Sequence, residues 1–416
     1  MIQNIVFYYP SKIIGGAELL FIRNAIHLSI ETEHIIYYVD YPDGISIGLL
    51  QDSSVKLIEY KRCKTVIPSN SLLVAQLNQI SNYDNLFLKS DNVRYLFWGI
   101  HPHNLRNWIY WHGKCLISDI AKKRIGITLS RLNDLGVVQF MDYVNYKTND
   151  DLFSIGKDDV SYLPVSVDDV CFVEKPRKGL LSENEIHFAW VGRICDDKYK
   201  TILTLMNEIE AYCCSKTKIL HVVGNGQYYD IIKGYASKMT YKIIFEGTIF
   251  PDKLGDFIRT KTDIGLAMGT SNLEFGCRGV PAILKGGVDD VRNAGYSKDY
   301  ILTNEIKGYS LGAFENFSMQ NQAERTFKEK VDLILNDYSN IAKKCYDYTK
   351  ENHSLKYTSN LIAHIVESAD NKENDEIEFL LKNIQDSINN GFYQKFHRSI
   401  MVLYRIKQKI AYLWQK

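Results

Sequence analysis

Short runs of β-branched and aromatic residues alternate along this chain with longer stretches whose apolar residues recur at helical spacing. The first run, Ile2–Tyr9, predicts a strand that ends at Pro10. A loop containing Gly15-Gly16 follows, and from Ala17 onward the apolar positions mark one face of a helix. The run His34–Val39 predicts the next strand. This order of strand, glycine loop, helix and strand indicates a βαβ unit, and therefore a parallel sheet covered by helices.

The same alternation continues to about residue 320, with one interruption. Further strands are predicted at Val55–Tyr60, Ser71–Ala75, Val93–Trp98 and Val137–Met141. Between Glu174 and Glu185 the apolar periodicity gives way to Lys, Pro, Gly and Ser, which predicts an interdomain linker. Beyond it, strands are predicted at Ile186–Val191, Ile219–Val223, Lys242–Phe245, Ile264–Ala267 and Pro281–Leu284, and helices at residues 197–213, 227–239, 253–259 and 273–278. Two successive parallel α/β units are therefore expected, with the carboxyl ends of their strands available for ligands.

The remainder of the chain is predicted to be mostly helical, including roughly residues 323–350, with an exposed charged break at Asp370–Glu378. Residues 391–416 differ from the rest, because apolar side chains recur there at steps of three and four and the segment has six Lys or Arg and no acidic residue. Such a basic amphipathic helix suits an anionic membrane surface. Packing on the body of the protein or on a partner subunit is an equally weighted alternative.

Composition narrows the class of protein. The chain has 416 residues with a formal net charge of +1, which argues against a general nucleic-acid binder. A hydrophobic fraction of 45% and a charged fraction of 24% exclude wholesale disorder. The eight cysteines are scattered without a CxxC pair, as is typical of reduced thiols in the cytosol. Without a signal-like N-terminus or a long apolar run, the sequence predicts a cytoplasmic protein.

The most informative segment for chemistry runs from Trp190 to Lys198. Its predicted strand ends in Gly192-Arg193, and Lys198 begins the following helix. Two cations at the carboxyl end of a strand, beside a helix N-terminus, predict a site for a diphosphate. A solvated arginine and an ordinary surface lysine are the alternative interpretation.

Two further segments strengthen the diphosphate interpretation. Gly224 and Gly226 follow the next strand, where they would let backbone come close to a ligand or would simply form a turn. Later, Thr270 and Ser271 are predicted to cap a helix and leave its first amides free for phosphate. Glu274 lies one turn into that helix, where it would accept hydrogen bonds from ribose hydroxyls or would be a first-turn acid stabilised by the helix dipole.

Taken together, these segments resemble the GT-B fold glycosyltransferases, specifically the large retaining family 4. The matching segments, in order, are Gly15-Gly16-Ala17-Glu18, Val191-Gly192-Arg193 with Lys198, Val223-Gly224-Asn225-Gly226, Phe245-Glu246-Gly247, and Glu274 with Gly279 and Pro281. Tyr162–Asp168 with Phe172 is similar to the segment that closes the first domain in that family. The resemblance spans about residues 1 to 350 and implies two Rossmann-like domains facing a central cleft, with a helical C-terminal extension.

The resemblance also assigns roles to parts of the chain. It implies an acceptor-side domain at residues 1–175, a nucleotide-sugar-binding domain at 184–350, and a helical return with the basic tail at 351–416. Arg193 and Lys198 would hold the diphosphate of the donor, Glu274 its ribose, and Gly15 and Gly16 would pack near the phosphates. The first of the family's two usual glutamates would fall at Leu266 and is therefore absent, which leaves the identity of the donor sugar open.

The family places a histidine at the end of a strand in the first domain, facing the donor sugar. Here the apolar strand Tyr95–Trp98 runs into His101 and His103, and His101 is the first candidate. The alternative is a purely structural histidine. A metal site at this pair would require a third ligand, and the sequence offers none nearby.

The function that this resemblance implies is transfer of a sugar from a nucleoside diphosphate sugar to a glycan with retention of configuration, in cell-surface polysaccharide synthesis. No cofactor and no metal are expected, because Arg193 and Lys198 supply the positive charge. The tail at residues 391–416 suggests a lipid-linked acceptor and a peripheral position at the inner face of the plasma membrane. Two alternatives stay open: a sugar-nucleotide epimerase on the same fold, and a catalytically inactive partner subunit of a transferase.

Overall fold

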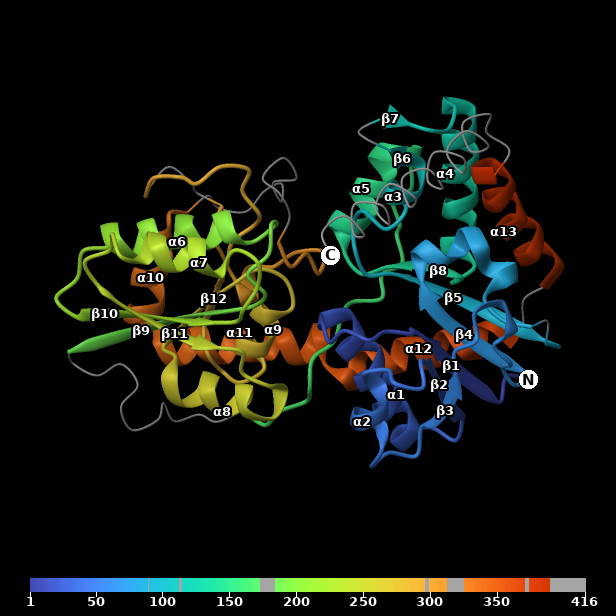
Figure 1. Ribbon diagram of the computed structural model, residues 1–416, viewed down its shortest axis with the longest axis horizontal. Coiled ribbons are helices and arrows are strands. Elements are labelled where there is room, and N and C mark those ends of the chain that lie inside the picture. Colours follow the sequence, from blue (N-terminus) through green and yellow to red (C-terminus); the bar gives the residue numbers. More distant parts are fainter. Residues whose placement is uncertain are drawn as a thin grey trace, which may run out of the picture. The chain divides into compact units, whose positions relative to one another are not determined.

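The computed structural model describes residues 1–88, 90–111, 114–172, 184–295, 299–312, 325–370 and 374–389. The chain forms two compact units, of which unit 1 comprises Met1–Leu163 with Ser359–Lys416 and unit 2 comprises Pro164–Thr358. Both units are drawn in Figure 1. The predicted linker, as far as residue 183, and the predicted basic helix at residues 391–416 lie outside the described residues.

Unit 1 is built on a six-stranded sheet with the order β3-β2-β1-β4-β5-β8, in which every pairing is parallel. Its strands are β1 (Asn4–Tyr8), β2 (Ile35–Asp40), β3 (Lys56–Glu59), β4 (Ser71–Gln76), β5 (Val93–Gly99) and β8 (Val138–Phe140). Each strand lies where the sequence pattern predicts one. A short antiparallel pair that the pattern did not predict consists of β6 (Tyr110–Trp111) and β7 (Lys114–Cys115).

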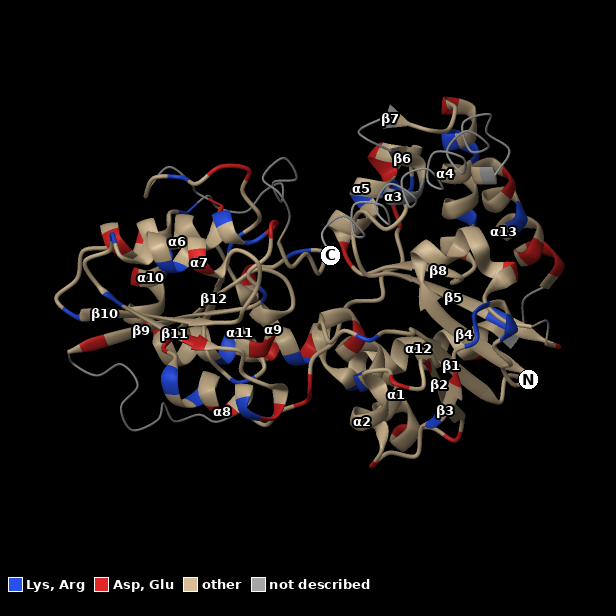
Figure 2. Ribbon diagram, in the orientation of Figure 1, with Lys and Arg blue, Asp and Glu red and all other residues tan. Residues whose placement is uncertain are grey.

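Helices connect and cover these strands. They are α1 (Gly16–Glu31), α2 (Ser46–Leu50), α3 (Arg106–Ile109), α4 (Asp119–Asp134) and α5 (Tyr143–Phe153), with the 3-10 helices η1 (Arg62–Lys64) and η2 (Leu77–Asn85). In Figure 2, strands β1 and β4 are drawn in tan, whereas α4 carries many charged residues. This is the pattern of a parallel sheet whose two faces are both covered, because its central strands are apolar on both sides.

The C-terminal helices return the chain to unit 1. Helix α12 (Leu355–Asp370) precedes α13 (Asn374–Asn389), whose residues Ile377, Leu381, Ile384 and Ile388 are buried in the same core as the sheet. The predicted break at Asp370–Glu378 is therefore wrong from residue 374 onward, where the chain is helical, although Asp375 and Glu378 are exposed as predicted. Its acidic residues Asp375 and Glu376 lie in the first turn of α13, where negative charge is favoured by the helix dipole.

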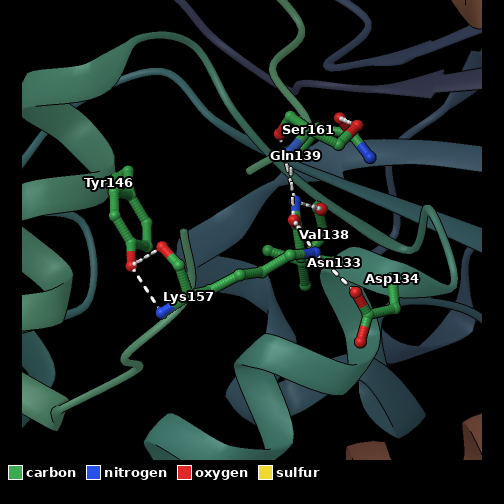
Figure 3. A network of polar contacts seen from close by, with 7 residues as sticks. All are labelled: Asn133, Asp134, Val138, Gln139, Tyr146, Lys157 and Ser161. Atoms are coloured by element: carbon green, nitrogen blue, oxygen red, sulfur yellow. Dashed lines mark hydrogen bonds and ion pairs between the residues drawn. The ribbon is translucent and has the colours of Figure 1, made fainter. Parts of the chain in front are cut away.

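A network of polar contacts fixes the segment that follows α5 (Figure 3). Asn133 at the end of α4 donates to the carbonyl oxygens of Val138 and Ser161, at 2.8 and 3.0 Å. Lys157 Nζ donates to Asn133 Oδ1 and forms an ion pair with Asp134 at 2.6 Å. Because buried backbone groups need partners, this network fixes the route of the chain past the edge strand β8.

The hydroxyl group of Tyr146 takes part in the same network. It donates to the carbonyl oxygen of Lys157 at 2.6 Å and accepts from the amide of Lys157 at 2.9 Å. We expect Tyr146→Phe to lower the free energy of unfolding by about 1–2 kcal/mol, because both backbone groups lose their partner. Urea-induced unfolding measures this loss. The control Tyr143→Phe, at an exposed ring, should stay within about 0.5 kcal/mol of wild type, and equal losses in both variants would contradict the prediction.

Unit 2 has a second six-stranded sheet, with the order β11-β10-β9-β12-β13-β14. Its strands are β9 (Glu185–Val191), β10 (Thr217–Val223), β11 (Lys242–Gly247), β12 (Ile264–Ala267), β13 (Ala282–Leu284) and β14 (Ile301–Leu302). All pairings are parallel except that between β13 and β14, which is antiparallel. The sequence pattern predicted all of these strands except β14.

Helices cover both faces of this sheet. They are α6 (Tyr199–Ala211), α7 (Tyr229–Ala236), α8 (Pro251–Lys261), α9 (Ser271–Gly276), α10 (Phe327–Asn336) and α11 (Tyr338–His353), with the 3-10 helix η3 (Thr303–Glu305). In Figure 1, α6 and α7 lie on one face and α8 on the other. Two separate apolar cores agree with this, one containing Ile202 and Ile232, the other Ile258 and Phe275. Unit 2 is thus a three-layer α/β structure, as the sequence predicts.

His353 at the end of α11 fixes the start of unit 2. The ring is buried, and its Nδ1 lies 2.7 Å from the carbonyl oxygen of Val165. The rings of Tyr309 and Tyr348 lie against it. Burial lowers the pKa of His353 from 6.5 to about 4, so the imidazole is neutral in the folded protein at pH 7 and donates through Nδ1.

Because His353 is buried in its neutral form, we expect the free energy of unfolding to fall in acid. The folded state binds fewer protons than the unfolded state between pH 6.5 and about 4, so the contribution is fully present at pH 7 and is lost as the pH falls through that range. We expect a loss of about 2–3 kcal/mol by pH 4.5 from this one group. Urea unfolding at several pH values should show a shallower decline for His353→Gln than for wild type. The exposed His364 provides the control, because His364→Gln should leave the slope unchanged.

Candidate functional site

The predicted phosphate-binding residues of unit 2 gather at one edge of its sheet. Strand β9 lies between β10 and β12, and the chain passes from β9 to β10 on one side before it returns to β12 on the other. This is a topological switch point, where the loops after neighbouring strands diverge and ligands commonly bind. Gly192, Arg193 and Lys198 follow β9, and Thr270 and Ser271 follow β12. The structure therefore brings these predicted residues to the same edge.

The backbone around Gly192 is held by the segment after β10. The amide of Gly192 donates to Val223 O and that of Ile194 donates to Asn225 O, each at 3.0 Å. A Cβ at Gly224 would lie 2.0 Å from Gly192 O, and one at Gly226 would lie 2.3 Å from Ile194 O. The close approach that these glycines permit is therefore to the 192–194 backbone. Their predicted contact with a ligand stays a prediction.

Neither predicted cation forms an ion pair within the described residues. Arg193 is exposed and Lys198 is half-buried, and no ion pair or hydrogen bond of the part that the structure describes holds either head group. Burial lowers the pKa of Lys198, although Asp197 and Cys195 act in the opposite direction. Burial also raises the pKa of the Cys195 thiol to about 11, so this neighbour is neutral at pH 7. A half-desolvated ammonium group without an ion-pair partner among the described residues is available for an anion.

Ser271, Trp190 and Lys198 each place a polar atom near Gly192. A Cβ on Gly192 would be 3.7 Å from Ser271 Oγ, 3.7 Å from Trp190 Nε1 and 3.8 Å from Lys198 Nζ. These three polar atoms therefore surround the bare face of Gly192. The predicted helix cap is wrong, because the N-cap residue of α9, Thr270, makes no side-chain cap hydrogen bond and has helical rather than extended dihedral angles.

Glu274 has a partner that the sequence analysis did not identify. Its Oε2 lies 2.6 Å from a guanidinium nitrogen of Arg278, and both side chains are largely buried. The arginine is four residues on, so the pair lies along one side of the segment that contains α9. The ion pair holds the Glu274 carboxylate in one orientation. A contact with ribose stays a prediction.

Unit 1 carries the other predicted residues at the carboxyl edge of its own sheet. The loop after β1 is tied down by Asp40 at the end of β2, which accepts from the amide of Ser11 at 2.8 Å. Gly15 is extended and Gly16 begins α1. The carboxylate of Glu18 folds back over this loop, since a Cβ on Gly15 would lie 2.7 Å from Glu18 Oε2. The absence of a side chain at Gly15 thus accommodates Glu18.

His101 follows β5, at the same edge of the sheet as the Gly15-Gly16 loop. It is exposed, and its Nδ1 accepts from the amide of His103 at 3.1 Å. In the neutral imidazole this arrangement places the proton on Nε2. His103 is more buried, and burial lowers its pKa, with His101 and Arg106 acting in the same direction. Within the described ranges no group of three metal-ligating side chains is assembled, at this pair or elsewhere.

Comparison with known proteins places the fold. No family model and no curated protein matches the chain. A glycosyltransferase from Rickettsia africae is 12% identical, with 89% of this chain and 100% of that chain covered at a TM-score of 0.57. Anabaena HepE in complex with UDP is 12% identical, covering 88% and 100%, with a TM-score of 0.50. The N-terminal domain of Candida albicans trehalose-6-phosphate phosphatase is 13% identical, covering 88% and 97%, with a TM-score of 0.53.

These likenesses agree with the topology. Two parallel-dominated six-stranded sheets, each covered by helices, are followed by helices that return to the first unit. None of the helices in the described ranges combines the length and the apolar character needed to cross a membrane. The chain has the two-domain α/β fold of the GT-B type, with a helical C-terminal region.

Proposed function

We propose that this chain is a glycosyltransferase that moves a sugar from a nucleoside diphosphate sugar to a glycan acceptor. The observation that carries the proposal is Lys198, a half-buried ammonium group without an ion-pair partner among the described residues, at the switch point of the unit 2 sheet where Arg193 and Ser271 also lie. A diphosphate supplies the missing negative charge. The GT-B fold, shared with a Rickettsia glycosyltransferase and with the UDP complex of HepE, supports this choice of ligand.

The charges suggest how the reaction proceeds. The bond between the anomeric carbon and the diphosphate oxygen breaks, and the diphosphate keeps the electron pair while the sugar becomes oxocarbenium-like. Lys198 and Arg193 stabilise the charge that develops on the diphosphate. The acceptor hydroxyl oxygen forms the new bond on the face that the diphosphate leaves, so the anomeric configuration is retained. The hydroxyl proton passes to a diphosphate oxygen. We assign Glu274 to the ribose and His101 to the sugar, and expect neither cofactor nor metal.

We further propose a lipid-linked acceptor in cell-surface polysaccharide synthesis. The support is the basic amphipathic pattern of residues 391–416, which suits an anionic membrane surface. Deleting these residues should move the protein from the membrane fraction of cells to the soluble fraction. Unchanged recovery with membranes would favour the alternative in which the segment packs on protein.

A ligand screen followed by a turnover assay tests the proposed activity. UDP-, GDP-, ADP- and TDP-sugars are added singly, and the matching nucleotide should raise Tm, because a ligand at 100 times its Kd stabilises by about 2.7 kcal/mol. The same donor is then incubated with and without glycan acceptors. Acceptor-dependent release of nucleoside diphosphate supports the transferase, and an isomerised donor without acceptor would favour an epimerase. Binding without either reaction would favour an inactive partner subunit.

A further inference from the structure

Two buried tryptophans near strand ends differ in one respect. Trp98 in β5 donates its indole N–H to the carbonyl oxygen of Leu163 at 2.7 Å. Trp190 in β9 is equally buried, with 1% of its surface exposed, but its Nε1 has no acceptor among the described residues. An indole nitrogen is a donor only, and a buried donor without an acceptor costs free energy. The unpaired N–H of Trp190 therefore calls for an explanation.

The position of this N–H gives one. Like Lys198 Nζ and Ser271 Oγ, it faces the bare side of Gly192, with each of the three atoms 3.7–3.8 Å from the point where a Cβ would lie. Apart from residues 191–193, no other atom is nearer to that point. We call these three atoms the three-donor cluster. They come from a strand, from the residue before α6 and from the first residue of α9, so the fold gathers them from separate elements.

All three atoms of the three-donor cluster can donate hydrogen bonds. The indole and ammonium groups can only donate, and the hydroxyl of Ser271 is able to donate. The acidic groups nearby do not complete it among the described residues, since Asp197 raises the pKa of Lys198 from a distance but forms no ion pair with it, and the Glu274 carboxylate is paired with Arg278. A group that satisfies three donors and one positive charge at once is an oxyanion with several lone pairs. A phosphate oxygen meets that description.

We propose that Trp190 is a further donor-binding residue, whose indole N–H hydrogen-bonds a phosphate oxygen that Lys198 and Ser271 also hold. The inference rests on the proposed function for the identity of the ligand, a nucleoside diphosphate sugar. Lys198 contributes charge on a flexible stem. The indole is fixed by the core around Ile202 and Met206, so its N–H has one direction and selects the position of the oxygen. Trp190 thus orients the diphosphate that the cations attract.

Inorganic pyrophosphate tests the inference without any assumption about the base or the sugar. The indole N–H signals of the five tryptophans are recorded by two-dimensional NMR, and each is assigned by single replacement with Phe. On addition of pyrophosphate, the Trp190 signal should move downfield as its hydrogen bond forms. The Trp98 signal should stay in place, because its hydrogen bond to Leu163 already exists. A Trp190 signal that does not respond at saturating pyrophosphate would overturn the proposal.

Calorimetric titration supplies the second measurement. Trp190→Phe keeps a ring but removes the N–H, and should weaken pyrophosphate binding about tenfold or more, as for the loss of a hydrogen bond to a charged group. Trp98→Phe is the matched control, which should leave the affinity unchanged. Equal affinity in Trp190→Phe and wild type would refute the assigned contact while leaving turnover of the nucleotide sugar as a separate test. A pyrophosphate response without such turnover would leave this contact standing and refute the transferase.

Discussion

The Lys198→Met variant is expected to lose about 10²–10³-fold in kcat/KM for sugar transfer, as when one preorganised charge-stabilising donor is removed from a site. The reason is that, in the proposed reaction, the Lys198 ammonium stabilises the charge that develops on the leaving diphosphate. Methionine keeps most of the apolar stem and therefore removes chiefly the charge. Release of nucleoside diphosphate in the presence of donor and acceptor measures the loss.

The same substitution should have the opposite effect on stability. Lys198 is half-desolvated, its pKa is lowered by burial, and no ion pair of the described part of the chain compensates it. Replacing it with an apolar side chain should therefore raise the free energy of unfolding without ligand, by about 1 kcal/mol. Lys200→Met is the matched control two residues on. Because the Lys200 ammonium already donates to the carbonyl oxygen of Asp289, this variant should leave kcat/KM unchanged. Equal activity losses in both variants, or a destabilised Lys198→Met, would contradict this role.

The architecture was predictable because its signals are local. Runs of β-branched residues mark buried strands, and the glycine loop after β1 marks the start of α1. Helix α13 shows the limit of this approach. Its first turn carries Asp375 and Glu376, which look like an exposed break, and the apolar residues that pack on unit 1 become regular only from Ile377. The partner that buries this face is far away in the sequence.

For the candidate site, the sequence predicts which residues follow the ends of the strands. Arg193 and Lys198 follow a strand in the sequence, and parallel strands share one carboxyl edge, so their convergence with Ser271 follows from topology. Trp190 and Arg278 could not be found in the same way. The pattern places Trp190 in the core, which is correct for its ring, and only the structure shows that its N–H has no acceptor among the described residues. The only sequence signal for Arg278 is its spacing of four residues from Glu274.

Gly224 and Gly226 were correctly predicted as positions where a side chain is excluded, but the physical reason differs from the predicted one. A glycine pair after a strand suggests backbone close to a ligand, whereas here each glycine faces the carbonyl oxygen of a residue in the 192–194 loop. Sequence patterns report that a side chain is excluded from a position. They do not report whether the excluding atoms belong to a ligand or to the protein itself, and this difference matters for the choice of variants.

We therefore expect Gly224→Ala to disrupt the site by displacing the backbone of the 192–194 loop. The φ angle of +137° is one that residues with a side chain rarely adopt, and the new Cβ would lie 2.0 Å from Gly192 O. The new Cβ and Gly192 O are both bonded directly to the backbone, so neither atom can move away without moving the chain. We expect a loss of about 3–5 kcal/mol in the free energy of unfolding of unit 2. The displacement also moves Gly192, around which Trp190, Lys198 and Ser271 are arranged, so pyrophosphate binding should weaken even where the variant is folded.

Gly234→Ala is the control that separates the two effects. Gly234 lies in α7, and a Cβ there would have nothing within 4 Å. Alanine is the better helix former, so this variant should be more stable than wild type by about 0.5–1 kcal/mol and should bind pyrophosphate normally. Urea unfolding and calorimetric titration of both variants give the comparison. If Gly224→Ala kept wild-type stability and affinity, neither the 192–194 loop nor the position of Lys198 would depend on this glycine.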